Sequence, residues 1–183
     1  MVLVRETVAA DWQALRDIRL EALRSAPEAF GSTYEREILR PEALWREWIA
    51  RGGTFLAFLD EVSALPEVGA QPEVSALPEV GAQPEVSAPA GLAGGYQEDP
   101  DTVELVSMYV RPQARGHAVG EALVAAVARW AEAKHAKSLH LWVTETNAPA
   151  RLLYERCGFS PTDEHQPLPS NPALGELGMT LAL

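Results

Sequence analysis

The stretch Met108-Tyr-Val-Arg-Pro-Gln-Ala-Arg-Gly-His-Ala-Val-Gly120 decides the fold, because it joins the strongest strand pattern of the chain to its clearest amphipathic helix. The segment 103–110 is rich in β-branched and aromatic residues, and Pro112 then removes a backbone donor from further pairing. Behind the glycines, apolar residues recur at helical spacing: Val119, Ala122, Leu123, Ala126, Val127 and Trp130. The stretch therefore predicts a strand, a glycine-containing loop and a buried helix in succession.

The loop between this strand and helix has the composition of an anion site. It carries two arginines and two glycines, and no acidic residue precedes Glu121. The first turn of a helix presents unpaired N–H groups and the positive end of the helix dipole, and Gly116 lets the backbone approach a phosphate without a Cβ. A phosphate-loop nucleotide binder is disfavoured, because no Lys-Ser or Lys-Thr follows Gly120. The dinucleotide fingerprint also fails, since the loop reads Gly116-x-Ala118-x-Gly120.

Two motifs carry a family resemblance. Gln113-Ala-Arg-Gly-His-Ala118 resembles the [QR]-x-x-G-x-[GA] motif of the GNAT superfamily of acyl-CoA-dependent N-acetyltransferases. One helix and one strand later, Asn147-Ala-Pro-Ala-Arg-Leu-Leu-Tyr-Glu-Arg-Cys-Gly-Phe159 is similar to the family signature N-x-x-A-x-x-x-Y-x-x-x-G-F. The resemblance extends more loosely over nearly the whole chain apart from one insertion, and it implies an acetyl-CoA-dependent N-acetyltransferase.

Composition narrows the class of protein. The 183 residues suit one domain, 1–183, and 47% hydrophobic with 22% charged residues are ordinary globular values. No apolar run approaches the roughly 20 residues that span a bilayer, and no signal peptide precedes the first strand, so we expect a cytoplasmic protein without a membrane partner. The single cysteine excludes an internal disulfide, and the net charge of −11 argues against nucleic acid as a partner. A homodimer is compatible with the sequence.

The order of elements predicts an α+β (mixed α/β) fold, which is also the fold that the resemblance implies. We expect a largely antiparallel, twisted sheet of about six to seven strands flanked by about four helices. The expected strands are 2–8, 54–59, 91–97, 102–110, 137–144, one starting at Phe159, and 176–183. The expected helices run from about Asp11 to Ser25, from Pro41 to Gly52, from Val119 to His135, and from Asn147 to Arg156, with Gly158 as a left-handed cap. The proline-rich segment 161–172 is predicted to be a loop.

Residues 61–90 differ in kind from the rest of the chain. They comprise five hexads, in which 61–72 and 73–84 are identical, and a proline in nearly every hexad opposes regular structure. We interpret this insertion as an extruded loop of polyproline II tendency between two hairpin strands, with no role in catalysis. A hexapeptide β-helix and a partner-binding segment are the alternatives.

The resemblance implies an acyl-CoA in a cleft where the strands 102–110 and 138–144 splay apart. Backbone groups of Met108 and Val110 would pair with the pantetheine amides, and the N–H groups of 115–120 would hold the pyrophosphate. The implied acetyl-CoA contacts are Met108, Tyr109, Val110, Gln113, Arg115, Gly116, His117, Ala118, Val119, Gly120, Asn147 and Ala150. No metal is expected, because the four histidines are scattered without ligand spacing.

Acetyl transfer to an amine needs a base and an acid. A primary ammonium, with a pKa of about 10.4, must lose a proton before it attacks, and the departing thiolate must gain one. The resemblance suggests Glu104 as the base and Tyr154 as the acid, in a direct attack within a ternary complex. The alternative roles are a surface glutamate and a packing tyrosine. Ser107 is a candidate assistant, and Cys157 is interpreted as packing.

The acceptor is not named by the sequence. A polyamine, an amino acid, an antibiotic, a protein N-terminus and a lysine side chain all stay open as the small-molecule or peptide amine. The net negative charge favours a cationic amine only weakly, because five of the acidic residues lie in the insertion. A non-catalytic acyl-CoA-binding sensor or interaction domain is the alternative function.

Overall fold

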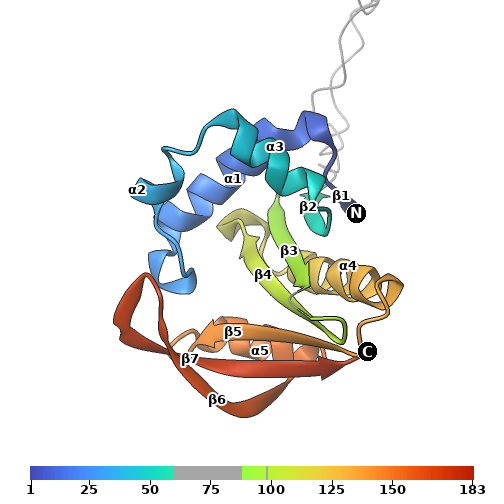
Figure 1. The fold of residues 1–183 in the computed structure, drawn as a ribbon, viewed down its shortest axis with the longest axis vertical. Coiled ribbons are helices and arrows are strands. Elements are labelled where there is room, and N and C mark those ends of the chain that lie inside the picture. Colours follow the sequence, from blue (N-terminus) through green and yellow to red (C-terminus); the bar gives the residue numbers. More distant parts are fainter. Residues whose placement is uncertain (60–87, 98) are drawn as a thin grey trace, which may run out of the picture.

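One twisted sheet organises the computed structural model, which describes residues 1–59, 88–97 and 99–183 (Figure 1). Its seven strands run in the order β1-β2-β3-β4-β5-β7-β6, and every neighbouring pair is antiparallel except β4 with β5. The strands are β1 (Val2–Glu6), β2 (Thr54–Leu59), β3 (Gly91–Gln97), β4 (Thr102–Val110), β5 (Ser138–Thr144), β6 (Ser160–Leu168) and β7 (Asn171–Ala182). The predicted mixed, largely antiparallel sheet is confirmed.

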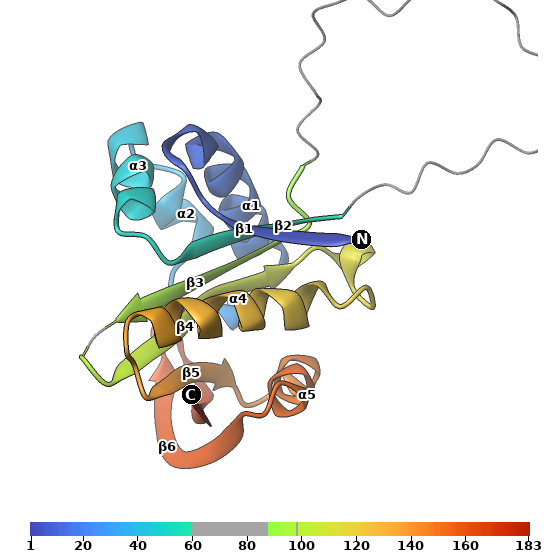
Figure 2. The same cartoon turned by 90° about the vertical axis from the view of Figure 1, so that its right-hand side faces the viewer.

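Helices cover both faces of the N-terminal half of the sheet (Figure 2). The α-helices are α1 (Trp12–Ser25), α2 (Tyr34–Glu37), α3 (Glu42–Ala50), α4 (Val119–Ala133) and α5 (Ala148–Arg156). Three short 3-10 helices are η1 (Ala9–Asp11), η2 (Pro27–Ala29) and η3 (Pro112–Ala114). The first three α-helices lie on one face, and α4 lies on the other (Figure 2).

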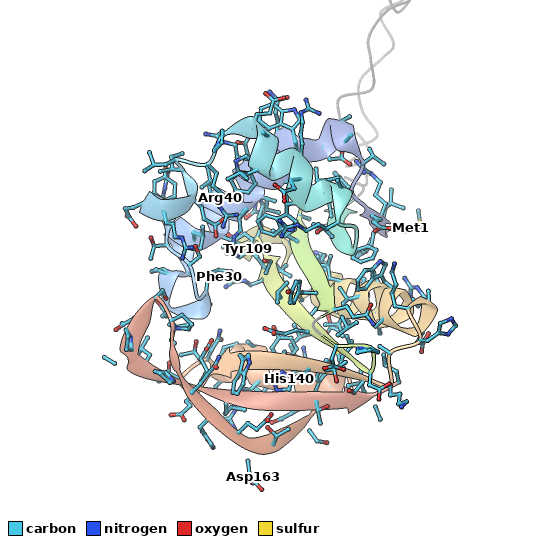
Figure 3. The ribbon with its side chains drawn as sticks, viewed as in Figure 1. Met1, Phe30, Arg40, Tyr109, His140 and Asp163 are labelled. Carbon is cyan, nitrogen blue, oxygen red and sulfur yellow. The ribbon has the colours of Figure 1, made fainter. Side chains whose placement is uncertain are left out.

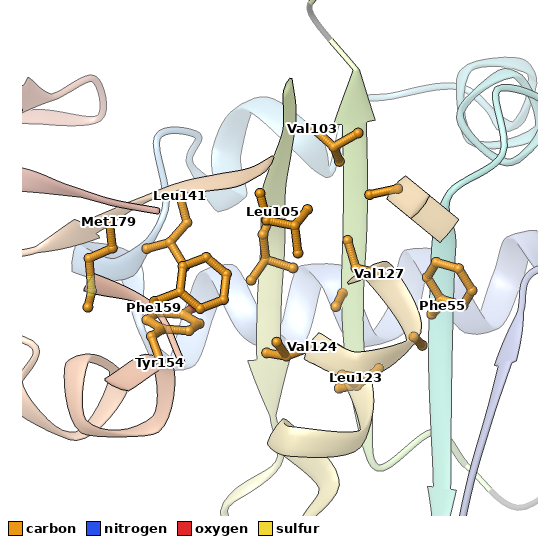
Figure 4. Close-up of a cluster of buried hydrophobic side chains, with 14 of the residues drawn as sticks. Phe55, Val103, Leu105, Leu123, Val124, Val127, Leu141, Tyr154, Phe159 and Met179 are labelled. Atoms are coloured by element: carbon orange, nitrogen blue, oxygen red, sulfur yellow. The ribbon is translucent and has the colours of Figure 1, made fainter. Parts of the chain in front are cut away.

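The strand β2 shows why both faces need cover. Its side chains alternate between two apolar cores: Phe55 and Ala57 face α4, whereas Leu56 and Phe58 face α1 and α3. A strand that buries both faces reads as a continuous apolar run, as 54–59 does. On the α4 side the core continues through β4 and β5 to α5, where Tyr154 and Phe159 pack together (Figure 4).

The prediction of a loop over residues 161–172 is wrong. Most of this segment is β6 and the start of β7, which form a hairpin at the edge of the sheet. An edge strand tolerates proline because one of its sides needs no donor, and Pro161 and Pro167 both lie in β6, beside shifts in its register. The last strand accordingly begins at Asn171 rather than at Glu176.

Two further differences lie in the N-terminal half. The first strand ends at Glu6, and a single turn of helix, α2, precedes the expected helix that follows Pro41. The α2 turn begins behind Thr33, whose hydroxyl oxygen accepts from the Arg36 N–H at 3.4 Å. No propensity signal marks a helix this short, but it positions Glu37 in the interior.

The predicted insertion begins and ends on neighbouring strands, because β2 and β3 pair as an antiparallel hairpin on either side of it. Residues 61–87, and with them the prediction of an extruded loop or a β-helix, lie outside the described residues. Ala90, predicted to end the insertion, instead belongs to the core: its N–H donates to the Ala57 carbonyl at 2.7 Å, and its carbonyl accepts from the Arg111 N–H at 2.9 Å. Within the described residues, no helix is long and apolar enough to cross a membrane.

Candidate active site

A cleft opens where the two halves of the sheet part. β4 and β5 pair only through Thr102–Glu104 and the facing residues 138–140, after which they diverge. Beyond that point β4 is bonded to β3 and β5 to β7, and a cleft of about 1060 Å³ lies between the halves. The predicted splay of these two strands is therefore confirmed, and the cleft is large enough for an extended ligand.

The loop at the start of α4 has the shape that the sequence predicted for an anion site. Gly116 has φ +80°, a conformation that favours glycine, and a Cβ added there would meet no atom within 4 Å. Ala118, at φ 59°, directly precedes the helix, whose first residues Val119 and Gly120 are buried. The backbone of the loop is thus exposed to the cleft while the helix behind it is anchored in the core.

The structure brings most of the sequence-predicted site residues together. Those that line the cleft are Glu104, Met108, Tyr109, Val110, Arg115, Gly116, Ala118, Val119, Gly120, Asn147, Ala150 and Tyr154. Gln113 and His117 are exposed and do not line it. The His117 ring instead turns back on its own loop, with Nδ1 3.1 Å from the Arg115 carbonyl oxygen.

The strand β4 is distorted at the cleft. Its register with β3 shifts between Leu92 and Gly94, and Ser107, opposite that shift, has a positive φ of 57°. A non-glycine residue rarely adopts this conformation, and such strain is concentrated at functional sites. The bulge changes the direction of the backbone immediately before Met108 and Val110, the two residues predicted to pair with a ligand.

Tyr109 contacts the other side of the sheet rather than the centre of the cleft. Its ring is buried against α1, and its hydroxyl donates to Glu21 Oε1 at 3.2 Å and accepts from Ser25 Oγ at 3.1 Å. Arg111 also binds the Glu21 carboxylate, with Nη2 at 2.6 Å from Oε2. This network fixes α1 to the end of β4, just before the loop that leads into α4. The spacing of residues in the sequence does not predict the network.

Tyr154 is 6% exposed, but it lines the cleft from α5. Burial raises the pKa of its hydroxyl well above the usual range, and Cys157 nearby adds to the effect. The group therefore keeps its proton at neutral pH. Within the described part of the chain this hydroxyl makes no hydrogen bond, and the side chain lines the cleft.

Glu104 lies at the fork of the sheet, the last residue of β4 to pair with β5 before the strands diverge. Its neighbours in register are Tyr96 on β3 and His140 on β5. Glu104 is partly buried and lines the cleft. Its position places a carboxylate at the inner end of the opening.

Asn147 has a local structural role as well as its position on the cleft. Its Oδ1 accepts from the Ala150 N–H at 3.3 Å and so caps α5. Gly158 follows the end of that helix with φ +93°, which confirms the prediction of a left-handed cap. Cys157 does not line the cleft, and burial raises the pKa of its thiol, which makes it a poor nucleophile.

The sequence did not single out a buried ion pair on the helical side of the cleft. Arg19 and Glu37 are 6% and 1% exposed, and Arg19 donates to both carboxylate oxygens, from Nη2 at 2.9 Å and from Nε at 3.1 Å. Burial opposes the charge of Glu37, but the hydrogen bonds and charge of Arg19, with Arg40 nearby, outweigh it and lower the Glu37 pKa. Nothing in helical spacing indicates that these two side chains meet.

Across the cleft, β5 and β7 contribute Trp142 and Glu176. Glu176 is 6% exposed, and burial raises the pKa of its carboxyl, although a hydrogen bond from Gln166 at 3.0 Å partly offsets this. Within the described residues, no three His, Cys, Asp or Glu side chains gather in a way that would hold a metal ion.

A family model described as "Acetyltransferase (GNAT) family" matches residues 12–159, which contain the bulged strand, the glycine-containing loop before α4, and α5. The chain belongs to the GNAT acetyltransferase family. It is therefore an acyltransferase by family, and the resemblance noted in the sequence is confirmed.

Individual relatives of this GNAT acetyltransferase are distant. An uncharacterised N-acetyltransferase of Schizosaccharomyces pombe is 34% identical over 73 residues, which are 39% of this chain and 45% of that protein. The match thus spans less than half the length of this curated relative. Among solved structures, YncA of Salmonella typhimurium, with its cofactor acetyl-CoA, has a TM-score of 0.70 at 16% identity and covers 100% of this chain and 94% of its own. A GCN5-related N-acetyltransferase of Kribbella flavida has a TM-score of 0.68 at 21% identity, with coverage of 100% and 98%.

Proposed function

We propose that this protein transfers an acetyl group from acetyl-CoA to a primary amine by direct attack within a ternary complex. The observation that carries the proposal is the coincidence of three features on one cleft: the open edge of β4 after Glu104, the anion loop at the start of α4, and the Tyr154 hydroxyl. Together they offer the parts of an acetyl-CoA site that a thioester with a phosphorylated carrier requires.

The fit to acetyl-CoA rests on the loop. Gly116 leaves open space where another residue would carry a Cβ, and the loop and first turn of α4 present backbone N–H groups to the cleft. Arg115 adds a guanidinium, which lies with Nε 3.3 Å from the Val110 carbonyl oxygen. These groups would hold the pyrophosphate, and the edge of β4 at Met108–Val110, which does not pair with β5, would hold the pantetheine arm as an added strand.

The chemistry then divides between two residues. Glu104 takes a proton from the acceptor ammonium, directly or through water, and the neutral amine attacks the thioester carbonyl. The C–S bond breaks as the C–N bond forms, and Tyr154 donates its proton to the departing sulfur. The new amide nitrogen then loses its second proton, which returns through solvent to the tyrosinate. A high tyrosine pKa makes a weak acid, but the thiolate leaves in the same buried surroundings, where desolvation raises its own proton affinity.

A non-catalytic acyl-CoA-binding module is the competing function. It would need the cleft and the loop but not a carboxylate at the fork or a buried hydroxyl without a partner. The presence of both groups on the cleft supports the enzyme.

The test is an assay of thiol release from acetyl-CoA over a panel of amino acids, polyamines, aminoglycosides and peptide amines, with mass spectrometry of the product. We expect at least one amine to be acetylated, and the rate to fall in Glu104→Gln and Tyr154→Phe. Tight acetyl-CoA binding by calorimetry with no transfer to any amine would favour the sensor module instead.

A further inference from the structure

The helical wall of the cleft carries a guanidinium held in an unusual degree of order. Arg19 from α1 is buried, pairs with both oxygens of Glu37, and lies between two aromatic rings. Its Cζ is 4.8 Å from the centroid of Phe30 and 5.8 Å from that of Trp48. Stacking and pairing together fix the plane of this cation, which still lines the cleft.

A second guanidinium shares the same carboxylate. Arg40 Nη1 lies 3.6 Å from Glu37 Oε2, and the Arg40 side chain is 30% exposed on the cleft. Its Cζ is 5.6 Å from the ring centroid of Trp45 and 5.7 Å from that of Trp48. Figure 3 shows Arg40 among the helices α1–α3. Two arginines beside one carboxylate leave one positive charge in excess. Ser32 Oγ is buried beside them, close enough to Glu37 to lower its pKa, yet it makes no hydrogen bond of good geometry with any described residue.

The opposite wall has the opposite charge. Glu104 lies on β4 and Glu176 on β7, and Trp142 and Gln166 line the cleft with them. Beside the fork, the cleft therefore has Arg19 and Arg40 on its α1–α3 side and two carboxyl groups on the sheet, whereas Arg115, Glu121 and Arg156 line it near α4 and α5. A third carboxylate, Glu28 on η2, lies at the rim and is exposed. A molecule that fits both walls carries an anion and an amine.

The two charged groups of such a molecule must lie close together. Arg19 Nη1 is 3.5 Å from Ser107 Oγ, and Ser107 directly precedes Met108, whose backbone is expected to pair with the pantetheine arm of acetyl-CoA. The arginines on the helical side of the cleft thus approach β4 one residue before the position expected to bind the pantetheine arm. An amine separated from its anionic group by a single carbon suits this spacing better than a long polyamine or a lysine side chain.

One side of the cleft is closed by the chain itself. The segment 28–31 reaches from α1 across to the other half of the sheet, where Thr144 Oγ1 donates to the Glu28 carbonyl at 2.6 Å and Ser170 Oγ donates to the Phe30 carbonyl at 2.6 Å (Figure 1). Gly31 lies against Pro169, which a Cβ on Gly31 would meet at 3.4 Å. A polypeptide acceptor cannot lie across the cleft on this side without breaking these contacts.

From these observations we infer that the acceptor is a free α-amino acid, whose carboxylate is bound by Arg40 and the outer edge of Arg19 while its amine faces Glu104. The inference rests on the proposed acetyl transfer and specifies its substrate class. A guanidinium offers two parallel donors that match a carboxylate, and among the described residues Arg40 has a single ion pair, the 3.6 Å contact with Glu37.

The test compares each standard L-amino acid with its carboxamide and with the amine that lacks the carboxyl group, in the thiol-release assay. We expect at least one amino acid to be used with a kcat/KM at least about 10-fold above its two counterparts, because a charge-assisted contact of this kind is worth about that factor. Arg40→Gln should raise the KM for the acid by about 10-fold with little change in kcat, and should bring the acid and the amide close to parity. Arg51→Gln, which removes an exposed arginine of the neighbouring α3 end, is the matched control and should change neither.

Equal use of acids and amides, or transfer only to polyamines, aminoglycosides or peptide amines, would overturn the inference and leave acetyl transfer standing. If no amine is acetylated, saturation-transfer NMR with the CoA-bound protein decides the point. Amino acids that bind wild type and bind Arg40→Gln more weakly would uphold the anion site while contradicting the proposed catalysis, and the absence of any amino-acid binding would contradict the inference.

Discussion

At the scale of single residues, a tyrosine hydroxyl and a glutamate carboxyl group line the cleft in different surroundings. Tyr154 is enclosed by apolar side chains, whereas Glu104 lies partly buried at the fork between two strands. Burial raises the pKa of Tyr154, so the hydroxyl remains protonated across the range in which an amine substrate changes its charge. This difference supports the proposal that Tyr154 on α5 is the proton donor and Glu104 on β4 the proton acceptor.

Replacement of Tyr154 by phenylalanine should slow the chemical step by about 10²-fold, the low end for general acid catalysis, with little change in acetyl-CoA affinity. The variant keeps the ring that packs against Phe159 and removes only the hydroxyl. Single-turnover rates measure the step directly, since product release can mask it in steady state. Tyr34→Phe, on α2 outside the cleft, is the control. Rates within about twofold of wild type would make Tyr154 a packing residue.

Replacement of Glu104 by glutamine should lower kcat/KM by about 10²-fold near neutral pH, and the deficit should shrink as the pH rises. The reason is that the neutral fraction of the free amine grows about 10-fold per pH unit below its pKa of about 10, so an enzymic base matters less. The pH profiles of wild type and variant provide the measurement, with Glu47→Gln on the exposed face of α3 as control. A deficit that does not vary with pH would point to a structural role.

At the scale of elements, the loop before α4 depends on one backbone conformation. Gly116→Asp places a carboxylate where the pyrophosphate is expected and should weaken acetyl-CoA binding by at least about 10-fold, roughly 1.4 kcal/mol. Gly116→Asn is the matched control, because asparagine has the same shape, tolerates a left-handed φ and carries no charge. Calorimetry on the folded variants measures both. Equal affinities for the two variants would show that no phosphate lies against this loop.

The ion pair between α1 and α2 contributes to stability as well as to the cleft. Glu37→Gln leaves Arg19 buried without its counter-charge and should cost about 3–5 kcal/mol in the free energy of unfolding. The Glu37 pKa is lowered in the folded state, so its contribution is complete above the ordinary value of 4.5 and is lost as the pH falls through the folded-state value.

Urea unfolding at several pH values tests this. The free energy of unfolding of the wild type should fall as the pH drops below 4.5 through the folded-state pKa of Glu37. That of Glu37→Gln should be lower at neutral pH and should change less on acidification. Glu47→Gln removes an exposed ion pair with Arg51 and should change the free energy of unfolding by less than about 1 kcal/mol. Equal stability of the Glu37 variant and wild type would contradict a net contribution from the pair.

Elements with a strong local pattern were predictable. The helix 119–133 and the strands β4 and β5 follow from apolar periodicity and β-branched residues, and β2 follows from its continuous apolar run. The hairpin of β6 was not, since its prolines are tolerated only by virtue of its position at the sheet edge, which is a tertiary property. The single turn α2 is likewise defined by the Glu37 that it buries.

At the scale of the whole molecule, the site exists because two half-sheets share only three residue pairs. The cleft wall formed by the end of β4, the loop before α4 and α5 could be predicted, since its residues lie within two continuous stretches, 108–120 and 147–159. The residues that accompany Arg19 could not, because Glu37, Trp142 and Glu176 come from three other elements and line the cleft with Arg19 only in the folded chain. The closing contacts of Thr144 and Ser170 are also long-range hydrogen bonds without a sequence pattern.

The most direct test of acetyl transfer in a ternary complex is a rapid-quench single turnover with acetyl-CoA labelled in its acetyl group and an amine from the panel that the protein acetylates. The label should pass from CoA to the amine in one phase, with none bound to denatured protein at any time, because Cys157 lies off the cleft and the transfer is direct. Label that accumulates on the protein before it reaches the amine, or label that leaves CoA only as free acetate, would contradict the account.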